Sequence, residues 1–113
     1  MEQRKAVVKT LYFSPKSDAD LIEMYHQLGA KKIAKAIKES LRMVVRPGYH
    51  SEFVDNLSLD PTSKTNSLEA VSINISFNAE GDGDLRTLLA STLSGKMSHL
   101  MKMALRYAVG PYF

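Results

Sequence analysis

Two short stretches of the chain alternate between apolar and polar residues, which is the pattern of a strand with one buried face. In "VSINISFN", residues 71–78, one face carries only apolar side chains, namely Val71, Ile73, Ile75 and Phe77. In "VVKTLYFS", residues 7–14, the matching face carries Val7, Lys9, Leu11 and Phe13. The one polar residue on that face, Lys9, predicts either a shifted or bulged first strand or a lysine whose stem reaches past the edge of the core.

Each predicted strand is followed by two stretches with apolar residues at helical spacing. The first helix after each strand is expected to carry a stripe of apolar residues: Leu21, Met24, Tyr25 and Leu28 in one case, and Leu85, Leu88 and Leu89 in the other. The second helices carry Ile33, Ile37, Leu41 and Val44/Val45, and Met97, Met101, Leu105 and Ala108/Val109. Pro47 and Pro111 follow these helices, where proline cannot continue a helix.

Acidic residues mark the expected starts of the two shorter helices. Ser17 or Asp18 is expected to cap the first one, which Gly29 ends. Asp18 and Asp20, like Asp82 and Asp84, would lie beside the positive end of a helix dipole. These carboxylates are therefore predicted to be helix-start residues.

The two halves of the chain repeat the same pattern at a constant offset of 64 positions. Residues 6–47 align with residues 70–111 without a gap, and 12 of the 42 pairs are identical: Ala6/Ala70, Val7/Val71, Phe13/Phe77, Asp18/Asp82, Asp20/Asp84, Leu21/Leu85, Lys32/Lys96, Lys38/Lys102, Leu41/Leu105, Arg42/Arg106, Val45/Val109 and Pro47/Pro111. Such a repeat indicates one strand–helix–helix unit used twice. The stretch between, 48–69, is rich in polar residues and is predicted to be a connector with a short turn of structure around 53–59.

One such unit cannot close a core, because its strand has unpaired edges and both helices expose apolar stripes. The 113 residues are therefore expected to form a single α+β domain in which the two strands pair as an antiparallel ribbon and the four helices interlock behind it. If the ribbon is symmetric about the repeat, paired positions sum to 84. Thr10 then faces Asn74, Tyr12 faces Ser72, and Val8 faces Ser76.

This order of elements, in "KTLYFSPKSDADLIEMYHQLGAKKIAKAIKESLR" and "INISFNAEGDGDLRTLLASTLSGKMSHLMKMALR", resembles the ribbon-helix-helix (Arc/MetJ-like) family of DNA-binding proteins. Two chains form the ribbon in that family. Here two units share one chain, as in a tandem form found among plasmid-transfer accessory proteins. The resemblance implies an intramolecular pseudo-dimer that inserts its ribbon into the major groove of double-stranded DNA.

The resemblance also implies which residues would contact DNA. Base-reading residues would lie on the open face of the ribbon: Thr10, Tyr12, Ser72, Asn74 and Ser76. Lys31, Lys32 and Lys96 would contact phosphates at the N-termini of the second helices. The chain departs from the family at Val8, which is apolar where a polar reader is usual, and at Lys9. A basic stripe of Lys31, Lys35, Lys38 and Arg42 is either part of this surface or simply solvated.

The composition of the chain indicates which classes of protein it can belong to. The chain is 44% hydrophobic and 24% charged, which is typical of a globular domain, and it has no cysteine, so that thiolate chemistry is excluded. Its apolar runs are too short for a membrane span, which predicts a soluble, cytoplasmic protein without a membrane partner. The net charge is +3, but residues 1–47 hold 10 Lys and Arg against 5 Asp and Glu, which favours a polyanionic partner.

The sequence offers little evidence for a catalytic or metal-binding site. The three histidines do not have the spacing of metal ligands: they are His26, His50 and His99. We therefore expect neither a metal site nor a cofactor. No candidate nucleophile has a general base placed beside it in the sequence. The sequence therefore predicts a non-enzymatic DNA-binding protein: a transcriptional repressor or other regulator, a plasmid partition protein or a transfer accessory factor. Further copies of the chain, side by side on DNA, are additional candidate partners. The alternative is a protein-interaction module that uses the same fold without nucleic acid.

Overall fold

The computed structural model describes residues 7–60, 69–78 and 81–109. It is an α+β protein with two strands, β1 (Val7–Phe13) and β2 (Val71–Phe77). Within the described ranges there are five helices: α1 (Ala19–Leu28), α2 (Ala30–Val45), α3 (Glu52–Asp55), α4 (Gly83–Ser91) and α5 (Ser94–Val109). Ala6 and Pro111, at the ends of the predicted units, lie outside the described residues, as does part of the connector, 61–68.

The two strands form an antiparallel ribbon, and both their bounds and their predicted register are confirmed. Pairing runs without interruption from Val7 opposite Phe77 to Phe13 opposite Val71, so every pair of positions sums to 84. The first strand is therefore neither shifted nor bulged. Lys9 lies opposite Ile75 and is half-buried, which is the position expected for a lysine at the edge of the core.

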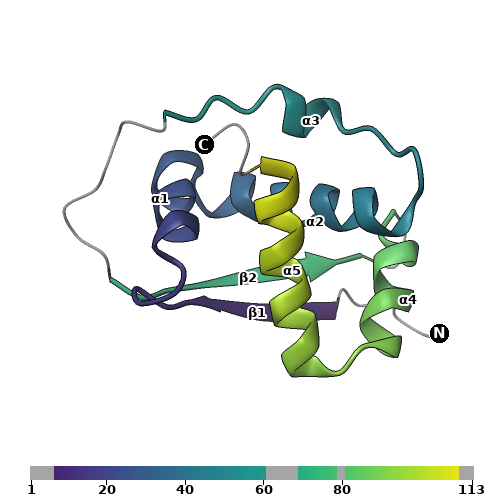
Figure 1. Ribbon diagram of the computed structural model, residues 1–113. Helices are drawn as coiled ribbons and strands as arrows, with labels where there is room; N and C mark the ends of the chain where they lie inside the picture. The colour runs from purple at the N-terminus through teal and green to yellow at the C-terminus, as the bar shows by residue number, and fades with distance from the viewer. Residues whose placement is uncertain (1–6, 61–68, 79–80, 110–113) are drawn as a thin grey trace.

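The core lies between the inner face of the ribbon and the two long helices. α2 and α5 make the most extensive helix–helix contact of the fold, and α5 crosses the ribbon in the view of Figure 1. Most of the buried side chains come from the ribbon (Leu11, Phe13, Ile73, Ile75 and Phe77), from α2 (Ile33, Ile37 and Leu41) and from α5 (Met97, Met101 and Leu105), while α1 adds Leu21, Ile22 and Met24 and α4 adds Leu85. These are the apolar stripes that the sequence pattern predicts for the interior.

The starts of the shorter helices are where the sequence predicts them, but the reason differs. α1 follows Asp18 and α4 follows Asp82, yet neither carboxylate caps its own helix. Instead, Asp18 accepts a hydrogen bond from the backbone N–H of Ser14 at 2.9 Å, and Asp82 accepts one from Asn78 at 2.8 Å. Each aspartate thus closes the turn that leaves its strand, and its remaining hydrogen-bonding capacity is directed toward another helix.

Part of the connector packs against the fold. Residues 49–60, which we call the covering segment, run back along α2 on the side away from the ribbon (Figure 1). Tyr49 donates to Glu39 at 2.9 Å, and at the other end the side chain of Gln27 pairs with the backbone of Asp60 at 2.8 and 2.9 Å. Val54 is buried in the core. The helical turn of this segment, α3, begins before the predicted 53–59 and is capped by Ser51, which accepts from Val54 N–H.

None of the helices in the described part of the chain has the length and apolar character needed to cross a membrane.

Candidate nucleic-acid interface

The open face of the ribbon consists of six exposed side chains without a formal charge: Val8, Thr10 and Tyr12 from β1, and Ser72, Asn74 and Ser76 from β2. They alternate with the core residues because successive side chains of a strand point to opposite faces. All five predicted base-reading residues therefore lie on one surface. Val8 joins them, with 55% of its surface exposed, and adds an apolar contact at one end of the ribbon.

At the centre of this face, Thr10 and Asn74 lie opposite each other and are bonded. The Thr10 hydroxyl donates to the Asn74 side-chain oxygen at 2.7 Å. This contact orients the carboxamide and leaves both amide hydrogens and one oxygen lone pair available. A carboxamide in that state can still donate to N7 and accept from N6 of adenine, which is the usual pairing of asparagine with a base.

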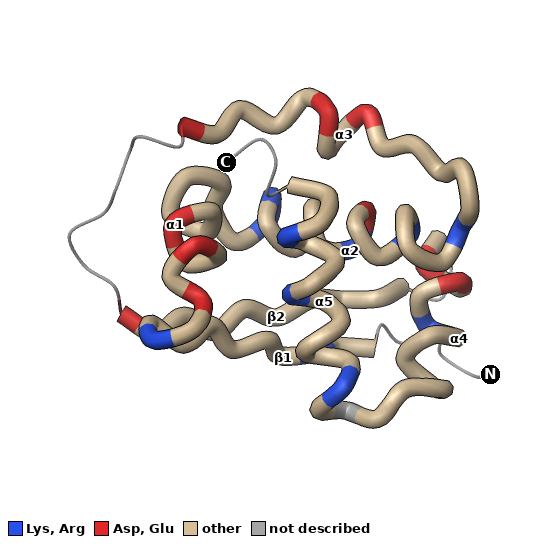
Figure 2. The backbone as a smooth tube through the Cα atoms, in the orientation of Figure 1, with Lys and Arg blue, Asp and Glu red and all other residues tan. Residues whose placement is uncertain are grey.

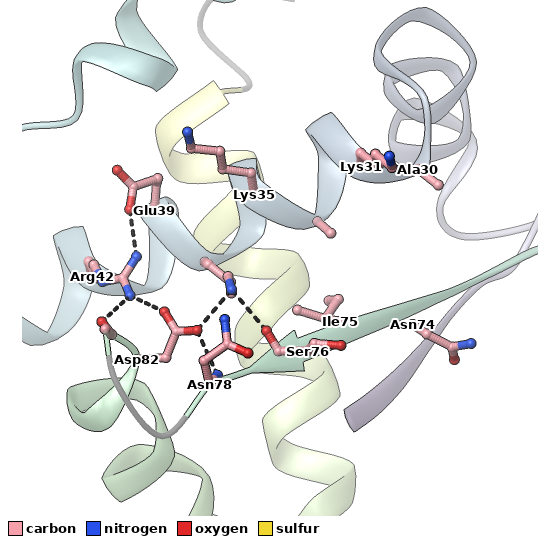
Figure 3. A pocket seen from close by; sticks show the side chains of 13 residues that line it. Ala30, Lys31, Lys35, Glu39, Arg42, Asn74, Ile75, Ser76, Asn78 and Asp82 are labelled. Atoms are coloured by element: carbon pink, nitrogen blue, oxygen red, sulfur yellow. Dashed lines mark hydrogen bonds and ion pairs between the residues drawn. The ribbon is translucent and has the colours of Figure 1, made fainter. Parts of the chain in front are cut away.

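Beside the ribbon, an open groove of about 520 Å³ separates β2 from α2. Lys31 lines it near the N-terminus of α2, facing a wall to which Asn74 and Ser76 contribute (Figure 3). Lys32, the next residue, instead lines a hollow beside the covering segment with Phe53 and Leu57. Thus α2 directs its two predicted phosphate contacts to different sides, and Lys31 is the one beside the base-reading residues.

The second long helix, α5, also begins with an exposed lysine, Lys96. It occupies the position of Lys32 in the offset of 64, and α5 has no acidic residue in its first turn. A cation at a helix N-terminus, beside free backbone N–H groups, favours an anion such as a phosphate.

Two ion clusters tie each short helix to the long helix of the other half. In the first, Asp18 accepts from Lys102 at 2.7 Å and from Arg106 at 3.0 Å, and Arg106 also reaches Asp20 at 2.9 Å. In the second, Asp82 accepts from Lys38 at 2.9 Å and from Arg42, which also binds Glu39 at 2.7 Å (Figure 3). Asp18, Lys102 and Arg106 differ by 64 positions from Asp82, Lys38 and Arg42, so the contact of an aspartate with these two cations is made twice.

Charge pairing dominates the electrostatics of both clusters. Burial raises the pKa of Asp18, but hydrogen bonds from Lys102, the Ser14 backbone and Arg106 outweigh it and hold the pKa below its ordinary value of 3.8. The pKa of Asp82 is lowered in the same way, against its burial, by Lys38, the Asn78 backbone and Arg42. Both carboxylates are therefore ionised wherever the protein is folded near neutral pH.

These clusters correct the expected basic stripe on α2. Lys38 and Arg42 are neither solvated nor open to a polyanion, because both are partly buried and paired with Asp82. Sequence reasoning missed this role, although the signal was present: Asp18/Asp82, Lys38/Lys102 and Arg42/Arg106 are all identical pairs of the repeat. Opposite charges that recur together at one offset indicate a contact between the two units.

Comparison with protein-family models, with curated proteins and with solved structures finds no match to this chain.

Proposed function

We propose that this chain is a tandem ribbon-helix-helix protein that binds double-stranded DNA by laying its β-ribbon in the major groove. The observation that carries the proposal is the open face of the ribbon, where six uncharged side chains lie in register on a two-stranded element. A two-stranded ribbon fits the major groove, where each base pair presents a distinct set of donors and acceptors. The role is that of a binding protein, a transcriptional regulator or a plasmid partition or transfer accessory factor, and not an enzyme.

Support for two related units in one chain comes from contacts that recur at the offset of 64. The strand register is symmetric about Thr10 and Asn74, and the ion clusters are reciprocal between the halves. A pseudo-dimer of this kind would present the N-termini of α2 and α5 to the phosphates on either side of the groove. Lys31 and Lys96 are the cations proposed for those contacts, whereas the predicted contact Lys32 is left out because it lines the hollow beside the covering segment.

Salt dependence tests the proposal. If two lysines neutralise two phosphates, the logarithm of the association constant should fall with a slope of about −1.8 against the logarithm of salt concentration. Affinity for a random duplex should then drop roughly 12-fold between 50 and 200 mM salt. Fluorescence anisotropy with a labelled duplex measures this directly. The proposal is contradicted if the chain binds no duplex even at low salt. It is also contradicted if the affinity for DNA does not change with salt concentration.

Substitution of Asn74 separates base reading from phosphate binding. Asn74→Ala should cost about 1–3 kcal/mol at a preferred target, which is the scale of one bidentate base contact. It should cost little on random DNA, because phosphate contacts dominate there. Lys96→Ala is the matched control and should weaken binding to both duplexes alike.

The open face of the ribbon also predicts the symmetry of the preferred DNA target. One end of the ribbon carries Val8 and Ser76, and the other carries Tyr12 and Ser72, so the two half-sites should differ. Selection from a random duplex pool provides the target for the Asn74 comparison. A perfect palindrome among the selected sequences would contradict the asymmetric reading, and equal losses on both duplexes would remove Asn74 from the reading surface.

A further inference from the structure

The outer faces of the two long helices differ in what covers them. On α2, the covering segment lies along the outer face: Phe53 packs under the Lys35 ammonium at 4.7 Å, and Glu39 accepts from Tyr49 and Ser51. On α5, the residues at the same positions of the repeat are exposed. Among the residues that the structure describes, the outer face of α2 is thus covered and that of α5 is exposed.

The open face is apolar. Met103 stands where α2 has Glu39 and is 52% exposed, and Tyr107 stands where α2 has Met43 and is 77% exposed. Leu100, in the position of the buried Ala36, is half-buried between them and the core. These side chains follow one another at helical spacing, so they form a continuous strip, which we call the α5 strip. Apolar side chains that are exposed together mark a binding surface more often than isolated ones do.

Charge determines which partner suits the α5 strip. The covering segment that occupies α2 is acidic: it carries Glu52, Asp55 and Asp60 and contains no lysine or arginine. α5 contains no Asp or Glu, and the contrast between acidic α3 and basic α5 is visible in Figure 2. Lys102 and Arg106 are engaged by the first ion cluster, whereas Lys96 and His99 flank the strip and are exposed.

We infer that the α5 strip is a docking site for an acidic amphipathic segment of a protein partner. The partner would resemble the covering segment, with aromatic and aliphatic side chains against Met103 and Tyr107 and with carboxylates toward Lys96. A second copy of the chain suits the site less well, because two α5 faces would bring like charges together.

A peptide with the sequence of residues 49–60, added to the intact chain, tests this inference. In the intact chain the outer face of α2 is already filled, so the peptide should bind at α5. With the methionine methyl groups labelled with ¹³C, the Met103 signal should shift saturably as peptide is added. Tyr107→Ser should weaken the apparent affinity about tenfold or more, as expected for loss of an aromatic anchor. Higher salt should weaken it further.

Two controls keep the test specific. Val44→Ser removes an apolar side chain on α2 that is 49% exposed, and it should leave the affinity unchanged. A scrambled peptide of the same composition should not bind.

The inference fails if the Met103 signal does not shift up to the solubility limit of the peptide, if the scrambled peptide shifts it equally, or if Val44→Ser and Tyr107→Ser have the same effect on the affinity. A Met103 shift that depends on protein concentration alone would assign the strip to a second copy instead. Duplex binding, measured on the same variants, reports separately on the proposed function.

Discussion

A chain that carries both Asp18→Ala and Asp82→Ala is expected to be largely unfolded. Each aspartate is almost fully buried, with 4% and 6% of its side chain exposed, and each accepts from two cations of the opposite half. Removing one partner of a buried ion pair leaves a desolvated charge behind and costs about 3–5 kcal/mol. We expect about 3 kcal/mol for each substitution, at the lower end, because Lys38 and Arg106 keep other hydrogen-bond acceptors.

The two losses should add, since the clusters share no residue, and together they approach the whole stability of an ordinary domain, about 5–15 kcal/mol. Urea denaturation followed by circular dichroism measures the single and double variants. The matched control is a chain with Glu52→Ala and Asp55→Ala, whose side chains are exposed and lie outside both clusters. Exposed ion pairs contribute at most about 1 kcal/mol each, so this control should remain folded. Single-variant losses no larger than those of the control would show that the clusters do not hold the fold together.

Acidification of the unaltered chain should produce the second large effect. The pKa values of Asp18, Asp20, Glu39 and Asp82 are all held below their ordinary values in the folded state. A lowered folded-state pKa stabilises the protein above the unfolded-state pKa, and that contribution disappears as pH falls through the folded-state value. Stability should therefore be flat near neutral pH and decline progressively between about pH 5 and pH 1.

The free energy of unfolding, obtained from urea titrations at a series of pH values, measures this decline. Asp82→Ala should show a shallower decline than the unaltered chain, because one of the responsible carboxylates is absent. A decline of the same steepness in Asp82→Ala would mean that other carboxylates cause the acid sensitivity.

Both predictions bear on the proposed DNA surface. The clusters fasten the start of α1 to the second half of α5, and the start of α4 to the second half of α2. They therefore hold the two long helices against the rest of the fold. Lys31 and Lys96 lie near the opposite, N-terminal ends of those helices. The paired cations in the clusters therefore serve the surface by positioning it, while the exposed lysines at the helix N-termini are the ones proposed to meet phosphate.

Local pattern determined most of the secondary structure of this protein. Strict alternation identified β2, a similar pattern interrupted at Lys9 identified β1, and helical spacing of apolar residues identified the four longer helices, because these periods follow from backbone geometry alone. Gly29, with φ of 86°, ends α1 because only glycine adopts that conformation without strain. The antiparallel register was predicted as the symmetric pairing centred on Thr10 and Asn74, and that register is the one observed.

Tertiary structure alone decided which side chains meet. Lys102 lies 84 residues from Asp18 and Arg106 lies 88 from it, and no local period specifies such partners. The sequence also did not indicate that Lys31 faces the ribbon and Lys32 faces the covering segment. Adjacent residues on a helix differ by a rotation about its axis, and only the packing of the helix shows what each direction meets. The covering segment packs on α2 and not on α5, and the sequence pattern of this polar connector did not indicate which helix it would cover. A sequence pattern assigns a residue to a face, and only the packing of the whole chain determines what that face meets.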